Sequence, residues 1–167
     1  MKDELSADVD LLTGAFKRGR LETELTLAVR AAKQQRRALS VLVLDVDDLQ
    51  ELNDLHGRDA LDVALGHLAA KVSEVVDGKG PIGRVGGDEL AVVLPGIGLD
   101  SARHLAERIR QAAPQTRHAS AFGDFRLTVS VGVAALRASE PSLNLLEAAE
   151  AACLRVKQGG RDGVASR

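Results

Sequence analysis

The sequence has little of several residue types, and each scarcity excludes a class of protein. Its 167 residues include one cysteine, three phenylalanines, and no tryptophan or tyrosine. A single cysteine cannot form an intramolecular disulfide, so the chain is not a disulfide-stapled secreted domain. No apolar run approaches the length that spans a bilayer or forms a secretion signal, which favours a cytoplasmic location. Few aromatic side chains are present to anchor a tight protein interface.

The chain also lacks an excess of charge of either sign. It carries 22 basic and 24 acidic residues, a formal net charge of -2. Binders of nucleic acid or membrane surfaces usually carry a basic excess. We therefore expect no polymeric nucleic acid and no membrane as partner, and a small ligand instead. The length and a hydrophobic content of 45% suffice for one sizeable core.

Hydrophobic periodicity predicts alternating helices and strands. Apolar residues at helical spacing predict helices near 21–32, 61–75 and 101–109 and a last helix from Ser142; Cys153 falls on the core face of that last helix. The apolar run 39–47 predicts a buried central strand, an alternating pattern predicts a strand over 127–133, and Gly-Gly and Gly-Asp pairs predict hairpins at 86–87 and 123–124. The order β-α-β-β-α-β is that of a ferredoxin-like palm. We predict a two-layer α/β (α+β) fold with a mainly antiparallel central sheet flanked by helices, and extra elements at both ends.

Acidic residues collect where two of the predicted strands meet turns. Asp45 ends the apolar run, and Asp88 and Glu89 follow the glycine pair of the first hairpin. Acids at a hairpin tip often serve solubility alone. If the two strands are neighbours, however, the carboxylates converge and repel one another unless a cation lies between them. Mg²⁺ is commonly held by one or two carboxylates plus substrate phosphates, so this edge predicts a magnesium triphosphate site. Asp47 would point the same way as Asp45 only if the strand continues, which favours a structural role for it.

Blocks of sequence along the whole chain resemble one family. Gly86-Gly87-Asp88-Glu89-Leu90 resembles the signature of the GGDEF family, the diguanylate cyclases, with leucine in place of the final phenylalanine. The other matching blocks follow the family order: Asp10-Leu11-Leu12-Thr13-Gly14, the segment 44–54, the segment 128–134, and Lys157 with Gly160-Arg161. The resemblance implies a lead-in at 1–9, too short and polar for a sensory domain, and a GGDEF-type domain at 10–167.

The resemblance implies an activity and its partners. GGDEF cyclases condense two GTP into cyclic di-GMP with loss of two pyrophosphates, one GTP being held by each half-site of a dimer. We expect a weak, transient homodimer, and a regulatory domain or protein is a further expected partner. The metals, Mg²⁺ or Mn²⁺, would be held by Asp45, the backbone carbonyl of Val46, and the acids Asp88 and Glu89. One of these two hairpin acids would also accept the proton of the attacking hydroxyl.

The guanine base is assigned to two residues. A carboxylate accepts the parallel N1–H and 2-amino donors of guanine, whereas adenine offers no 2-amino group, so Asp62 would select guanine. Taken alone, Asn53 would more often form a turn and Asp62 would be a solvated helix residue. Their separation matches the asparagine and aspartate of the family's guanine site, which favours the functional interpretation.

The triphosphate is assigned to two cations and one loop. The resemblance places Lys157 and Arg161 on phosphates, although basic residues at a helix end also complement the helix dipole. Backbone N–H groups at a helix start can cradle phosphates. Such groups are expected at Asp48, Leu49 and Gln50.

The chain departs from the family pattern at several positions. Asp48 replaces a common histidine or phenylalanine, Gln50 a lysine, Arg58 a histidine, Leu61 a glycine and Leu154 a tyrosine. Asp48 adds negative charge and Gln50 removes positive charge where a triphosphate should lie, and Arg58 compensates in part. A degenerate GGDEF module that binds GTP or a protein without turnover is therefore the alternative. The R-x-x-D motif of cyclic di-GMP receptors is absent, because the matching positions read Asp77-Gly78-Lys79-Gly80.

Overall fold

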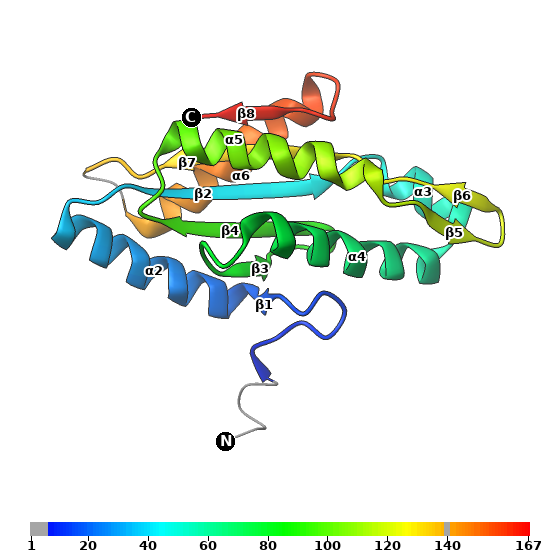
Figure 1. Cartoon of the computed structure of the whole chain (residues 1–167), viewed down its shortest axis with the longest axis horizontal. Helices are drawn as coiled ribbons and strands as arrows, with labels where there is room; N and C mark the ends of the chain where they lie inside the picture. Colours follow the sequence, from blue (N-terminus) through cyan, green and yellow to red (C-terminus); the bar gives the residue numbers. More distant parts are fainter. Residues whose placement is uncertain (1–6, 139–140) are drawn as a thin grey trace.

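A six-stranded sheet with helices on both faces organises the computed structural model, which describes residues 7–138 and 141–167 (Figure 1). The strands of the sheet lie in the order β1-β3-β4-β2-β7-β8, and β5 and β6 form a separate hairpin. In chain order the elements are β1 Phe16–Lys17, α2 Arg18–Gln35, β2 Leu39–Val46, α3 Leu49–His56, α4 Arg58–Val76, β3 Ile82–Arg84, β4 Glu89–Pro95, α5 Leu99–Ala112, a 3-10 turn Ala113–Gln115, β5 His118–Ser120, β6 Gly123–Phe125, β7 Val129–Ala135, α6 Ser142–Gln158 and β8 Val164–Ser166.

The predicted palm is confirmed. Its four strands lie in the order β3-β4-β2-β7, all antiparallel to their neighbours, with α4 and α5 as the crossover helices. The register pairs Asp45 with Glu89 on β4 and with Ser130 on β7. The two acidic strand ends predicted from the sequence are therefore direct neighbours.

Helices on both faces explain why β2 is apolar without alternation. Leu42 and Leu44 face the cluster built with α4 and α5, whereas Val41 and Val43 face the cluster built with α2 and α6. A strand buried on both faces needs apolar side chains at every position. The two-layer description covers the palm itself, and α2 and α6, the predicted extra elements, add a third layer on the opposite face.

The β5–β6 hairpin packs against the junction of α3 and α4. The ring of His56, the last residue of α3, stacks on Phe125 with centroids 4.3 Å apart, and its Nδ1 is 2.9 Å from the Ser120 hydroxyl. The hairpin predicted at 123–124 is confirmed, with its turn at 121–122, just before the predicted glycine. These contacts hold the hairpin against the end of α3, the helix that carries Asn53.

The lone cysteine is a core residue, as predicted. Cys153 is buried, and its Sγ donates to the carbonyl of Ser130 at 3.2 Å. Burial raises the pKa of its thiol to about 12, and the nearby Asp45 adds to the shift. The thiol is therefore unreactive at neutral pH. Within the described ranges, no helix has the length and apolarity needed to cross a bilayer.

Candidate active site

Carboxylates meet at one end of β2, where a cation already lies among them. The side chain of Asp45 is 20% exposed, and its Oδ1 is 3.1 Å from the Lys157 ammonium. That ammonium donates to the backbone carbonyl of Val46 at 2.6 Å and lies 3.9 Å from Asp47. The last turn of α6 thus places Lys157 against two of the four groups predicted as metal ligands, the Asp45 carboxylate and the Val46 carbonyl.

Burial and a like charge perturb Asp45. Desolvation, followed by the contact and charge of Asp88, raises the pKa of Asp45 from 3.8 to about 7, although Lys157 opposes the shift. Asp45 Oδ1 is buried and accepts no hydrogen bond of good geometry within the described structure. Its close partners are the Lys157 ammonium, at ion-pair distance, and the Asp88 carboxyl group. Two carboxyl groups this close together favour binding of a cation, because a cation offsets their mutual repulsion.

Gly86 lies directly under the side chain of Glu89. A Cβ added at Gly86 would collide with the Glu89 carboxylate, which folds back over this residue. Burial raises the pKa of Glu89, and the charges of Asp88 and Glu150 add to the effect. The β2–β4 register places Glu89 beside Asp45, and Gly86 leaves room for the position that the Glu89 carboxylate adopts.

Asp47 is structural, as predicted. Strand β2 ends at Val46, and the buried Asp47 carboxylate accepts from Ser130 Oγ at 2.7 Å and Thr128 Oγ1 at 2.9 Å. It also accepts from the backbone N–H of Asp162 at 3.0 Å. These donors saturate the carboxylate and fasten the segment after α6 to β7.

The residues predicted to bind the base and its surroundings line one hollow of about 260 Å³. It is lined by Leu49, Gln50, Asn53, Arg58, Leu61, Asp62, Leu65, Arg84 and Gly87. Asn53 comes from α3 and Asp62 from α4, so the elbow at Gly57 places both on the same wall. Gln50 donates to Asp54 at 3.0 Å. The leucines supply apolar faces suited to a purine ring.

Arg84 lines this hollow and is absent from the sequence-based site. Its guanidinium donates to the Gly87 carbonyl at 3.1 Å through Nε and to both oxygens of Asp10 at 3.2 Å. Asp10 also accepts from the backbone N–H and hydroxyl of Thr13. Arg84 therefore joins the Asp10–Gly14 motif to the glycine pair. The position of Arg84, two residues before the glycine pair, could have suggested a role in the site. Its partner Asp10, however, lies 74 residues away in the chain.

Arg161 is held by an anion of the chain itself. Its Nε lies 3.0 Å from Asp48 Oδ1, with both side chains about half exposed. Asp48 precedes α3 in a left-handed conformation with φ of 53°. The pair spans the gap between the end of α6 and the start of α3, which is where the triphosphate is predicted. Asp48 therefore forms an ion pair with Arg161, the cation that a bound phosphate would need.

Removing that competing charge should strengthen nucleotide binding. We expect Asp48→Asn to bind 3′-deoxy-GTP with Mg²⁺ about 3- to 10-fold more tightly at low salt, because Arg161 is released and a repulsive charge is lost. Isothermal titration calorimetry measures the change, and 3′-deoxy-GTP lacks the hydroxyl needed for condensation. Asp124→Asn is the matched control, since Asp124 forms an exposed pair with Arg117 at 3.3 Å. Equal affinities for wild type and Asp48→Asn would contradict the competition.

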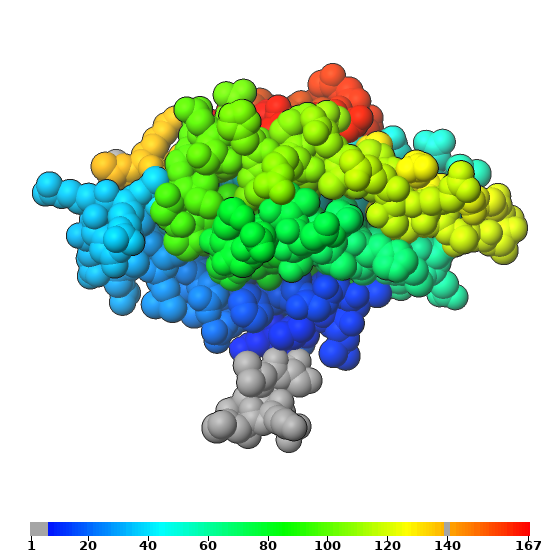
Figure 2. All heavy atoms as spheres, viewed as in Figure 1, coloured from blue at the N-terminus to red at the C-terminus, as the bar shows by residue number. Residues whose placement is uncertain are grey.

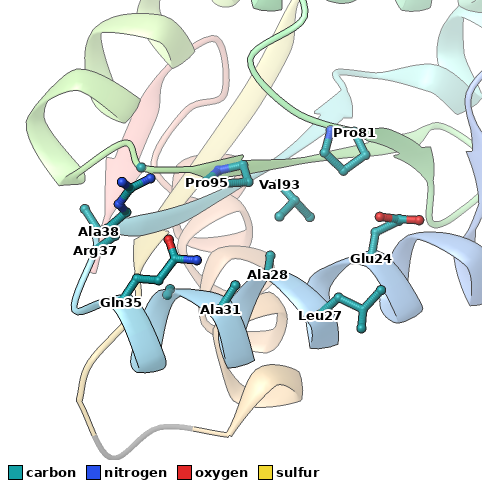
Figure 3. Close-up of a pocket in the computed structure, with 12 residues that line it drawn as sticks. Glu24, Leu27, Ala28, Ala31, Gln35, Arg37, Ala38, Pro81, Val93 and Pro95 are labelled. Carbon is teal, nitrogen blue, oxygen red and sulfur yellow. The ribbon is translucent and has the colours of Figure 1, made fainter.

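A second hollow lies apart from all of these residues. Figure 3 shows it between α2 and β4, with Val93 pointing toward the helix. Ala28 and Ala31 line its helix side, while Glu24 is paired with Arg20 at 2.6 Å. None of the predicted site residues lines it, so it has no part in the predicted chemistry.

The residues at the end of β2 fit a divalent cation that is completed by phosphate. Asp45 has a buried oxygen without a hydrogen bond, and the Val46 carbonyl already contacts a cation, the Lys157 ammonium. In the described part of the chain, no three His, Cys, Asp or Glu side chains converge closely enough to hold a metal by themselves. Mg²⁺ sites of nucleotide enzymes are typically of this kind, with few carboxylates and several phosphate or water oxygens.

The palm and its acidic edge define a class, the nucleotidyl cyclase-like domains. The family model "Diguanylate cyclase, GGDEF domain" matches residues 7–163. The chain therefore belongs to the GGDEF family of diguanylate cyclases.

Relatives and solved structures agree with the family assignment. The chain is 31% identical over 163 residues to "Probable diguanylate cyclase DgcF" of Escherichia coli K12, covering 95% of this chain and 51% of that protein. The GGDEF domain of DgcB from Caulobacter crescentus, solved with cyclic di-GMP, superposes with a TM-score of 0.91 at 28% identity, covering 96% of this chain and 93% of that one. Diguanylate cyclase SiaD of Pseudomonas aeruginosa, solved with its activator SiaC, gives 0.90 at 28% identity, covering 95% and 61%. The chain spans between 34% and 51% of the length of the first curated relatives that it matches.

Proposed function

We propose that this domain condenses two GTP into cyclic di-GMP and two pyrophosphates, with one GTP held by each of two facing half-sites. The observation that carries the proposal is that the hollow lined by Asn53 and Asp62 also includes Gly87, on the hairpin whose Glu89 is the register partner of Asp45. Membership of the diguanylate cyclase family supports the same reaction.

Each group has a proposed task. Asp62 accepts from N1–H and the 2-amino group of guanine, and Asn53 bonds the same base edge. Arg58 lies at the first turn of α4 and lines the same hollow. Lys157 and Arg161 exchange their internal partners for phosphate oxygens. The backbone N–H groups of Leu49 and Gln50, in the first turn of α3, need no partner within that helix and would donate to the same phosphates.

The carboxylate edge would hold the divalent cation, Mg²⁺ or Mn²⁺. Asp45, the Val46 carbonyl and the hairpin acids are the proposed ligands. Such a cation lowers the pKa of an attacking hydroxyl and neutralises a leaving pyrophosphate. Asp88 or Glu89 accepts the hydroxyl proton, since both lie on the hairpin beside Asp45.

The second candidate is a module that binds GTP or a protein without turnover. The Asp48–Arg161 pair favours it, because a phosphate-binding cation is occupied, and Gln50 stands where the family has lysine. SiaD was solved with a protein activator, which makes a regulatory protein a proposed partner here as well.

One assay separates the candidates. The protein is incubated with GTP and Mg²⁺, pyrophosphate release is followed, and the nucleotide product is identified by mass spectrometry. Cyclic di-GMP with two pyrophosphates per product supports the cyclase. Calorimetric binding of GTP with no product supports the GTP-binding module. Absence of both GTP binding and product overturns the cyclase and the GTP-binding module, and leaves only a module that binds a protein.

Feedback by cyclic di-GMP through the segment 77–80 is not expected. Lys79 lies 3.6 Å from Asp77 and donates to the Val76 carbonyl, and no arginine stands at the first motif position. Adding 50 µM cyclic di-GMP should change the initial rate by less than about twofold, since a recognition site without its arginine loses the strong bidentate contacts. Inhibition that disappears in Asp77→Ala but persists in the matched surface variant Asp124→Ala would contradict this expectation.

A further inference from the structure

The segment after α6 is strained and held from two sides. Arg161 and Asp162 are consecutive non-glycine residues with positive φ, 66° and 41°, and Gly160 before them has φ of 123°. Such conformations are costly for residues with side chains and persist only where surrounding contacts hold them. The segment 159–163, called here the phosphate loop, carries Arg161.

The inner anchor is Asp47. Its buried carboxylate accepts from the Asp162 N–H at 3.0 Å, and the Gly163 carbonyl accepts from Val131 on β7 at 2.9 Å. These bonds fix the backbone of the phosphate loop to the sheet.

The outer anchor is Arg110 on α5. Its Nε and Nη2 donate to the two oxygens of Glu107 at 2.9 and 2.6 Å, which fixes the guanidinium plane. Its remaining Nη1 donates to Asp162 Oδ1 at 2.8 Å. Figure 2 shows the C-terminal segment, in red, lying against α5, and α5 itself is fixed by a buried face that includes Leu105 and Ile109. Asp162 is thus held by two hydrogen bonds: its backbone N–H donates to Asp47, and its carboxylate accepts from Arg110.

We propose that Arg110 is a positioning residue for triphosphate binding, acting through Asp162 on the phosphate loop and so on Arg161. The proposal rests on the proposed function, in which Arg161 meets phosphate. With both anchors present, the Arg161 side chain is directed at the start of α3, where it contacts Asp48. Without the outer anchor, the strained loop relaxes toward ordinary backbone conformations and the guanidinium moves away from that position. The base hollow is built by α3, α4 and the glycine hairpin, and it does not depend on Arg110.

The test compares ligands with and without the outer phosphates. In Arg110→Met, the affinity for 3′-deoxy-GTP with Mg²⁺ should fall about 5- to 10-fold, while the affinity for GMP, which lacks the β and γ phosphates, should stay within about twofold. Arg110→Lys keeps the charge and should recover part of the loss. Arg20→Met is the matched control, because Arg20 also forms an ion pair within its own helix, with Glu24.

Amide hydrogen exchange gives a readout independent of nucleotide. The Asp162 N–H should exchange about 10-fold faster in Arg110→Met than in wild type, while core amides of β2 remain protected. Unchanged exchange at Asp162, or equal losses for GMP and 3′-deoxy-GTP, would overturn the positioning role alone. If wild-type protein binds GMP and 3′-deoxy-GTP with the same affinity, the β and γ phosphates contribute nothing to binding. That result would overturn the proposed phosphate site and the inference that rests on it.

Discussion

Asp45→Asn should abolish magnesium-dependent nucleotide binding and yet make the metal-free protein more stable. The carboxylate is the central ligand of the proposed cation site, so its loss should remove the gain in 3′-deoxy-GTP affinity that Mg²⁺ gives and lower any turnover by at least about 100-fold, the scale of losing one electrostatic stabiliser. Calorimetry with and without Mg²⁺ measures the first effect, and cyclic di-GMP formation measures the second.

The stability gain follows from the raised pKa of Asp45. Burial first, and Asp88 next, raise this pKa from 3.8 to about 7, so the folded state binds the proton more tightly than the unfolded state. Stability therefore falls as the pH rises from about 4 to about 7 and stays low above that window. Asparagine removes this penalty. We expect the unfolding free energy of Asp45→Asn to exceed that of wild type by about 1–3 kcal/mol at pH 8. This is less than the full pKa difference implies, because Asp45 is coupled to Asp88 and partly exposed. At pH 4.5 the difference should be much smaller.

Denaturant unfolding at both pH values, without metal, measures this difference. Asp100→Asn is the control, because it removes an exposed carboxylate at the start of α5. A folded Asp45→Asn protein that keeps its Mg²⁺ dependence would contradict the ligand assignment. A variant less stable than wild type at pH 8 would contradict the origin of the pKa shift.

Forced dimerisation is expected to raise specific activity by about 10-fold or more at 1 µM protein. The proposed reaction needs two loaded half-sites face to face, and a linked pair sees an effective partner concentration in the millimolar range. The described surface offers weak anchors for spontaneous association: Phe122 is its one exposed large aromatic side chain, and the exposed leucines are distributed over α2, α3, α6 and the segment before β1. Association also costs translational and rotational entropy that only a strong contact can offset.

The measurement compares the free domain with a fusion to a parallel dimeric coiled coil, as cyclic di-GMP formed per protomer across a range of protein concentrations. The total activity of the free domain should rise more than linearly with protein concentration, so that its activity per protomer rises. The total activity of the fusion should be proportional to protein concentration. The fusion carrying Asp45→Asn controls for contaminating cyclase. Constant activity per protomer in a demonstrated monomer would contradict the two-half-site reaction.

Much of the fold could be predicted because hydrophobic patterns are local. The apolar run 39–47 has no alternation, which indicates burial on both faces, and the glycine pair at 86–87 marks a hairpin. Once β2 and β4 are neighbours, the convergence of Asp45 and Glu89 follows from the register. The core position of Cys153 was equally local, because helical spacing placed it among apolar residues.

By itself, the sequence determined the palm, the acidic strand ends, and the family to which the chain belongs. Only the tertiary structure decided which charges neutralise one another. It placed Lys157 on Asp45, Arg161 on Asp48, and Arg84 on Asp10. These partners are separated by between 74 and 113 residues of chain, the latter from Asp48 to Arg161. Ion pairs have no periodic signature in a sequence, because any cation can meet any anion that the fold brings within reach. Their geometry is set by packing and strand register, which are properties of the whole domain.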